Sequence, residues 1–137
     1  MKYIRMAALV FIIFNHWQVF AASISDDAFE RCLVRTQKDR LSCESDCGLI
    51  LQGCYEEGIS DATEKSDVLQ SKIASKSGGA CSTLASVYIE DAKVMERDIS
   101  RRAALLPGWV ASELSLNFAR QRLSNLRAIE KNCRQLK

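Results

Sequence analysis

Six cysteines and one histidine are the residues whose types and spacing could do chemistry in this sequence. The cysteines are Cys32, Cys43, Cys47, Cys54, Cys81 and Cys133. An even number of cysteines in a small exported chain is typical of a disulfide framework, because oxidising compartments convert to disulfides the thiols that the cytosol keeps reduced. We therefore expect up to three disulfides, and the sequence alone does not choose among the possible pairings.

A thiolate metal site is the alternative for four of these cysteines. Cys43 and Cys47, with Cys32 and Cys54, offer the four sulfur ligands that tetrahedral zinc accepts. Zinc ligand pairs more often sit on a turn at closer spacing, and an exported chain favours disulfides. Disulfides are the favoured interpretation, so we expect neither a metal nor a cofactor.

The only histidine, His16, lies in a segment that we expect to be removed. Lys2 and Arg5 precede an apolar run over residues 6–14, and Asn15 and the small residues around Ala21 follow it. This order is that of a cleaved secretory signal over residues 1–21. The run is too short to span a bilayer, so we expect no stable membrane anchor and a periplasmic or secreted product.

Removal of the signal leaves a chain without histidine and without excess charge. Histidine-dependent nucleophile pairs and histidine metal ligands are then excluded, and we expect no catalytic residues and no enzyme activity. Catalysis by carboxylates alone is the weaker alternative. The 19 basic residues become 17, which equals the 17 acidic residues. A neutral chain does not predict nucleic-acid binding, which normally needs a net basic face.

Apolar residues recur every three or four positions along most of the mature chain, which predicts helices. Cys32, Cys43 and Cys54 follow one another at intervals of eleven residues, or about three helical turns. In an unbroken helix they would share one stripe and lie too far apart to bond. A break at residues 42–45, with Ser42 as the cap of a second helix, would allow the chain to fold back. Both arrangements are open.

Glycine and proline mark the remaining helix boundaries. We expect Gly58 to close the first helical region, and Asp61 with Glu64 to cap a short polar helix that ends before Gly78. Longer helices are predicted over residues 80–106 and from Trp109 to the C-terminus, separated by Pro107. No segment alternates like a strand. The predicted fold of residues 22–137 is one all-α domain, a disulfide-stapled bundle of three to four antiparallel helices.

Charge is distributed unevenly along this predicted bundle. Residues 26–67 hold eleven acids and five bases, whereas residues 68–137 hold six acids and twelve bases. An acidic patch and the single turn-located tryptophan are therefore the candidate partner-binding residues. They are Glu56, Glu57, Asp61, Glu64, Asp67 and Trp109. A merely solvated loop for the acids, and packing of Trp109 under the loop between the last two helices, are the alternatives.

The two ends of the mature chain resemble a known family. An opening Phe29-Glu30-Arg31-Cys32-Leu33, a second cysteine three turns later, and a closing helix with Gln-Arg, a later Arg and a Cys are similar to the lysozyme inhibitor LprI-like family. Cys32, Cys43, Gln121, Arg122, Arg127 and Cys133 take the family positions. The resemblance implies a small periplasmic helical domain that binds and blocks a cell-wall hydrolase.

The leading hypothesis is an exported, non-enzymatic domain that binds a protein, with a basic lysozyme-like hydrolase as the specific partner. Lysozymes are typically basic, so the acidic half of the chain is a plausible electrostatic match. The alternative is an envelope structural, assembly or toxin-immunity factor whose protein partner is unknown.

Overall fold

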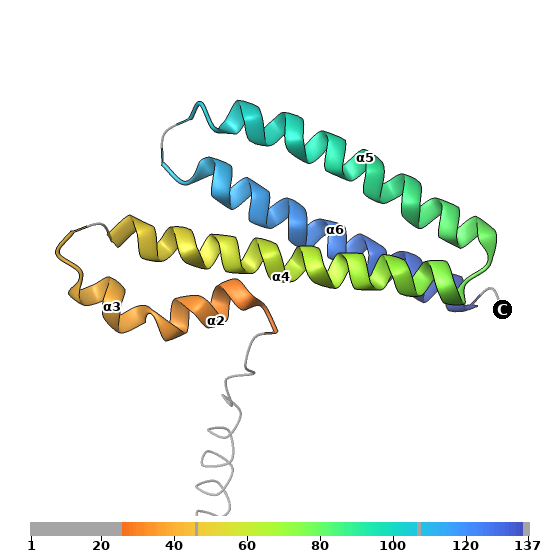
Figure 1. Cartoon of the computed structure of the whole chain (residues 1–137), viewed down its shortest axis with the longest axis horizontal. Helices are drawn as coiled ribbons and strands as arrows, with labels where there is room; N and C mark the ends of the chain where they lie inside the picture. The colour runs from red at the N-terminus through yellow and green to blue at the C-terminus, as the bar shows by residue number, and fades with distance from the viewer. Residues whose placement is uncertain (1–25, 46, 107, 136–137) are drawn as a thin grey trace, which may run out of the picture.

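The computed structural model describes residues 26–45, 47–106 and 108–135 of the chain, and the described part is all-α (Figure 1). It contains α2 (Ala28–Arg35), α3 (Gln37–Ser42), α4 (Cys47–Lys76), α5 (Gly79–Ala103) and α6 (Val110–Gln135). The predicted helical class is confirmed, with three long helices and two short ones. The predicted signal, residues 1–21, lies outside the described residues.

The long helices α4 and α6 form the centre of the molecule. Helix α5 packs against them on one side, and α2 and α3 lie on the other side, against the first half of α4 (Figure 1). A cluster of apolar side chains fills the space where α4, α5 and α6 meet. It comprises Leu69, Ile73, Ala85, Ile89, Leu123 and Leu126. Burial of this cluster is the main force that holds the three long helices together.

The first helical region is broken, and the chain folds back on itself. Helix α3 ends at Ser42 and α4 begins at Cys47, so the arrangement with one unbroken helix is wrong. Ser42 is the last residue of α3, and its Oγ donates to the carbonyl oxygen of Lys38 at 2.9 Å. It is therefore not the cap of the following helix. The reversal places α2 alongside α4, with Cys32 beside Cys54.

Gly58 lies in the interior of α4, and the predicted helix boundary at this residue is wrong. Its backbone is buried where α2 and α6 both approach. A Cβ at this position would lie 2.7 Å from Cβ of Phe29 and 2.9 Å from Cδ1 of Leu116. The missing side chain thus permits close helix packing rather than a turn, and Asp61 and Glu64 are interior residues of α4 that cap no helix.

The remaining boundaries follow the predicted glycine signals. Gly78 caps α5 after a short connection from α4, so this boundary is confirmed. Gly108, at the turn before α6, has φ = 74°, in the left-handed region that glycine adopts without strain. Helix α5 ends at Ala103, three residues earlier than predicted. Beyond the helix end, the backbone N–H groups of Leu105 and Leu106 donate to the carbonyl oxygens of Arg102 and Ala103, which forms two hydrogen-bonded turns.

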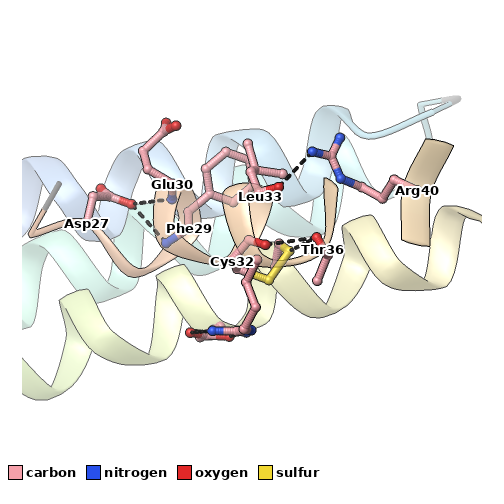
Figure 2. The surroundings of a disulfide bond; sticks show 10 residues. Asp27, Phe29, Glu30, Cys32, Leu33, Thr36 and Arg40 are labelled. Carbon is pink, nitrogen blue, oxygen red and sulfur yellow. Dashed lines mark hydrogen bonds and ion pairs between the residues drawn. A yellow bond between two sulfur atoms is a disulfide. The ribbon is translucent and has the colours of Figure 1, made fainter. Parts of the chain in front are cut away.

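All six cysteines are paired in disulfides, as predicted. Cys32–Cys54 joins α2 to α4, Cys43–Cys47 closes the turn between α3 and α4, and Cys81–Cys133 joins the start of α5 to the end of α6. Figure 2 shows the first of these under the α2 backbone, where Thr36 Oγ1 donates to the carbonyl oxygen of Cys32 at 2.8 Å. Two of the three disulfides thus fix the α2–α3 segment to α4.

Candidate protein-binding surface

Three aromatic rings from three separate helical segments form a continuous row. Trp109, just before α6, stacks on Tyr55 of α4 with ring centroids 6.0 Å apart and planes 21° from parallel. Tyr55 in turn lies 4.8 Å from the ring of Phe29 on α2, at 34°. We call Phe29, Tyr55 and Trp109 the aromatic row. The rings are only partly buried, and Trp109 retains 37% of its accessible surface.

Gly48 is the residue that admits Trp109 to this position. A Cβ on Gly48 would lie 3.2 Å from the indole ring, so the ring rests directly on the backbone of the first turn of α4. A second contact between the same helices comes from Ser112, whose Oγ donates to Oε1 of Gln52 at 3.2 Å. Trp109 therefore joins α6 to the start of α4, rather than lying only under the α5–α6 loop.

Arg120 closes the other end of the aromatic row. Its guanidinium carbon lies 5.4 Å from the centroid of the Phe29 ring, within the range of a cation–π contact. Its Nε donates to Oδ2 of Asp27 at 2.7 Å, and its Nη2 lies 3.6 Å from Oε1 of Glu30. These two acids hold the guanidinium over the ring.

Asp27 also begins α2. Its Oδ1 accepts hydrogen bonds from the backbone N–H groups of Phe29 and Glu30, at 3.0 and 3.3 Å (Figure 2). The hydrogen bond from Arg120 is the largest cause that lowers the pKa of Asp27, and the two backbone donors lower it further, while burial opposes them. The bond to Asp27 correspondingly raises the pKa of Arg120. The carboxylate and guanidinium thus stay ionised together.

The acidic patch predicted from the sequence lies along α4, but most of its members are engaged by cations of the same chain. Glu57 forms an ion pair with Arg35 at 2.6 Å, and this hydrogen bond lowers the pKa of Glu57. Asp61 pairs with Lys65 at 2.9 Å, and that contact is the largest cause that raises the pKa of Lys65.

The other predicted acids differ in their surroundings. Asp67 lies 3.6 Å from Nζ of Lys93 on α5, and Glu56 accepts a hydrogen bond from Gln52 at 2.9 Å. Glu64 lines an open groove of about 450 Å³ between α4 and α6, together with Val68 and Leu123. The five acids therefore do not form a uniformly negative surface. Of these five acids, only Glu56 and Glu64 have no cationic side chain of the described residues within 4.0 Å.

Arg122, one of the residues that carry the family resemblance, is nearly fully buried. Its guanidinium pairs with Glu96 of α5 and donates from Nη2 to Oγ1 of Thr63 on α4 at 2.9 Å. It therefore links the three long helices and has little surface to offer a partner. Of the other three positions in this helix that carry the resemblance, Gln121 bonds to Asn125, Arg127 lines the α4–α6 groove and Cys133 is in a disulfide with Cys81.

The structure brings together residues that the sequence did not single out as a site. Trp109 is among the predicted binding residues, whereas Phe29 and Arg120 are not. Tyr55 carried no separate signal. The residues that meet Trp109 come from α2 and α4, far away in sequence, so only the fold-back of α2 reveals the row.

Residues 26–45, 47–106 and 108–135 contain no group of three or more cysteine, aspartate or glutamate side chains placed to hold a metal ion. None of the helices in these ranges is both long and apolar enough to cross a membrane. No protein-family model, no curated protein and no solved structure matches the chain.

Proposed function

We propose that this chain is an exported, non-enzymatic domain that binds another protein through the aromatic row and Arg120. The observation that carries the proposal is the continuous Trp109–Tyr55–Phe29 row, still partly open to solvent and ending in a held guanidinium. Tryptophan, tyrosine and arginine are the residues most enriched among the energetic centres of protein interfaces. Here all three types occur in one row on a rigid framework.

The rigid framework supports the proposal energetically. The cap at Asp27, the Cys32–Cys54 disulfide and the contact of Trp109 with Gly48 fix all three rings before a partner arrives. A preordered surface loses less conformational entropy on binding, so more of the contact energy remains as affinity. The three disulfides are typical of an oxidising compartment, and we propose the periplasm or the extracellular space as its location.

The partner class that we propose is a lysozyme-like cell-wall hydrolase. The resemblance of the chain ends to the LprI-like family motivates this choice. Exposed acids lie on the helices that carry the row, namely Glu30 on α2, Glu56 on α4 and Glu113 on α6. Opposite charge on a basic hydrolase would speed encounter and fix orientation.

Binding of the mature chain to c-type, g-type and i-type lysozymes, measured by calorimetry at low salt, tests the proposal. We expect Trp109→Ala to weaken binding by about 10- to 100-fold, as for an interface hot spot. Leu41→Ala is the matched control, because Leu41 is an exposed large apolar residue on α3, outside the row. An unchanged affinity of Trp109→Ala would contradict the proposed surface.

Absence of binding to all three lysozyme types would reject the hydrolase as partner. Affinity capture from the native envelope, with wild type and Trp109→Ala in parallel, would then test the surface itself. A partner that wild type captures and Trp109→Ala does not would support the aromatic row as the binding surface. The function would then belong to the envelope-assembly or immunity class. A partner held equally by both would reject the row.

A further inference from the structure

The three disulfides differ in how closely a thiol from outside the molecule can approach them. Cys32 and Cys54 are 3% and 0% exposed, and Cys133 is 6% exposed. Cys43 and Cys47 are both partly exposed and lie at the turn between α3 and α4. Exchange with an external thiol requires direct approach of its thiolate to a sulfur atom. Of the three disulfides, Cys43–Cys47 alone has both of its cysteines outside the buried interior.

Cys43–Cys47 also closes the shortest loop of the three. Its cysteines are 4 residues apart in sequence, against 22 for Cys32–Cys54 and 52 for Cys81–Cys133. A disulfide that closes a longer loop constrains the unfolded chain more and stabilises the fold more. The folded state resists the loss of a disulfide by the stability that the disulfide contributes, so it resists the loss of Cys43–Cys47 least. Access and stability therefore single out the same bond for reduction.

This disulfide ties a weakly packed helix to the start of a long one. None of the six residues of α3 is buried. Cys47 is the first residue of α4, where the first four backbone N–H groups have no partner within the helix. Reduction releases both sides, so we expect the start of α4 to fray locally. The core between α4, α5 and α6 is held by its own apolar cluster and by Cys81–Cys133, and should stay folded.

The start of α4 is also the support of Trp109. Gly48 directly follows Cys47, and a Cβ at Gly48 would lie 3.2 Å from the indole ring. Fraying of this first turn removes the contact between Trp109 and the backbone of Gly48. Tyr55 lies about two turns further along α4, so its contact with Trp109 remains. Reduction of Cys43–Cys47 thus loosens Trp109 without dismantling the rest of the aromatic row.

We propose that Cys43–Cys47 is a reducible switch that sets the order of Trp109 and, through it, the affinity of the aromatic row. The link to affinity rests on the proposed function of the row, whereas the link to Trp109 does not.

The reductant in this proposal is a thioredoxin-like dithiol. One of its thiolates attacks Sγ of Cys43, which forms a mixed disulfide and releases the Cys47 thiolate at the start of α4, where the helix dipole stabilises negative charge. Its second thiolate then displaces Cys43 and closes the dithiol to a disulfide. The electron pair and the protons lost by the dithiol pass to the two cysteines, so reoxidation by a disulfide of the same class reverses the step.

The order of reduction is measured on the mature chain with graded dithiothreitol, followed by alkylation with iodoacetamide and mass spectrometry. We expect Cys43 and Cys47 to become alkylated at least about tenfold faster than the cysteines of the other two disulfides, because exchange depends on access. Alkylation of all six cysteines together, or of another pair first, would overturn the proposal.

Trp109 reports the second step, since the other tryptophan, Trp17, lies in the predicted signal. Once only Cys43–Cys47 is open, we expect acrylamide to quench Trp109 fluorescence about twofold more strongly, with helical circular dichroism retained. Cys43→Ser/Cys47→Ser should show the raised quenching without reductant and no further response to it. Unchanged quenching in the reduced chain would overturn the proposal.

Two glycine variants test whether the coupling passes through Gly48. A Cβ at Gly48 displaces the indole in advance, so Gly48→Ala should show raised quenching before reduction and a smaller change on reduction. Gly53→Ala is the matched control, because a Cβ there meets nothing within 4 Å, and it should respond like wild type. A Gly48→Ala variant that responds like wild type would overturn the assigned route.

The switch and the proposed function can fail separately. Where the oxidised chain binds a lysozyme, the chain with Cys43–Cys47 reduced should bind it at least about fivefold more weakly, because Trp109 must then be ordered on binding. Equal affinity of the two forms would overturn the switch. If no lysozyme binds the oxidised chain, the hydrolase is rejected as partner, and the alkylation and fluorescence measurements still decide the switch.

Discussion

Asp27 and Arg120 lie 93 residues apart in the chain, yet the Nε of Arg120 donates to Oδ2 of Asp27 at 2.7 Å. The other oxygen of the same carboxylate accepts from the first backbone N–H groups of α2. One side chain therefore starts a helix and fixes that helix to α6. The position of Phe29, and with it one end of the aromatic row, depends on this double role.

Stability should fall in acid because the pKa of Asp27 is lower in the folded chain than its ordinary value of 3.8. Above that value the carboxylate is ionised in both states, and its full contribution is present. As the pH falls below it, the unfolded chain binds the proton first, and the contribution is lost as the pH passes the folded pKa. Glu57 and Glu130, whose pKa values are also lowered, act in the same direction.

We expect Asp27→Asn to lower the free energy of unfolding by about 1 kcal/mol at neutral pH, since the pair with Arg120 is only partly buried. The amide can still cap α2, so Asp27→Ala should cost about 1 kcal/mol more. Urea titrations at neutral pH and near pH 2.5 measure both effects, and the difference between wild type and Asp27→Asn should shrink in acid, as the carboxylate begins to bind its proton. Asp39→Asn, an exposed carboxylate on α3, is the control. A difference that is as large in acid as at neutral pH would show that charge is not its cause.

Gly58 and Gly53 form a matched pair for testing close packing within α4. A Cβ at Gly58 would meet Phe29 and Leu116, whereas a Cβ at Gly53 would meet nothing within 4 Å. We therefore expect Gly58→Ala to destabilise the fold by about 1 to 3 kcal/mol through overpacking. Gly53→Ala should stabilise it by about 0.5 to 1 kcal/mol, the gain of alanine over glycine in a helix. Equal effects in chemical denaturation would contradict the assigned role of Gly58.

Substitutions in the buried pair Arg122–Glu96 should have strongly non-additive effects on the free energy of unfolding. Glu96→Leu leaves the Arg122 guanidinium buried without its counter-charge, and we expect a loss of about 3 to 5 kcal/mol. Combining it with Arg122→Met should restore most of that stability, because an apolar pair needs no desolvation. Asp67→Asn, which breaks the exposed pair with Lys93, should cost less than about 1 kcal/mol. A double variant no more stable than Glu96→Leu alone would refute the explanation.

The stability lost when each disulfide is removed should increase with the length of chain that the disulfide closes into a loop. The sequence separations are 52 for Cys81–Cys133, 22 for Cys32–Cys54 and 4 for Cys43–Cys47. Loop entropy then predicts losses of about 4, about 3 and about 2 kcal/mol for the three Cys→Ser pairs. Urea unfolding of each double variant measures the order. Cys43–Cys47 ranking first would contradict loop closure as the main source of the stabilisation.

Helical periodicity predicted most of the fold because it reports directly which side of a helix is buried. The helices predicted over residues 80–106 and from Trp109 onward correspond to α5 and α6. The helix boundary predicted at Gly58 was wrong because glycine occurs both at turns and where another helix packs closely. The choice between these depends on Phe29 and Leu116, which are distant in sequence. Local sequence carries no information about that approach.

The candidate site was less predictable than the fold, for the same physical reason. Trp109 stood out by its position at a turn, but its neighbours Tyr55 and Phe29 come from segments that meet only after the chain reverses between α3 and α4. The acidic residues were recognisable in the sequence, whereas their ion pairs with Arg35, Lys65 and Lys93 were not. Composition reveals charge, but pairing depends on three-dimensional neighbours.

The disulfide connectivity has a consequence for biogenesis. Cys43–Cys47 is nested inside the loop closed by Cys32–Cys54. A chain oxidised strictly in the order in which its cysteines emerge would join Cys32 to Cys43 and Cys47 to Cys54. Reaching the native state from there requires thiol–disulfide exchange, whereas Cys81 and Cys133, the last two to emerge, pair correctly without it. Maturation of the α2–α3 segment, and therefore assembly of the aromatic row, would then depend on a disulfide isomerase in the compartment that receives the chain.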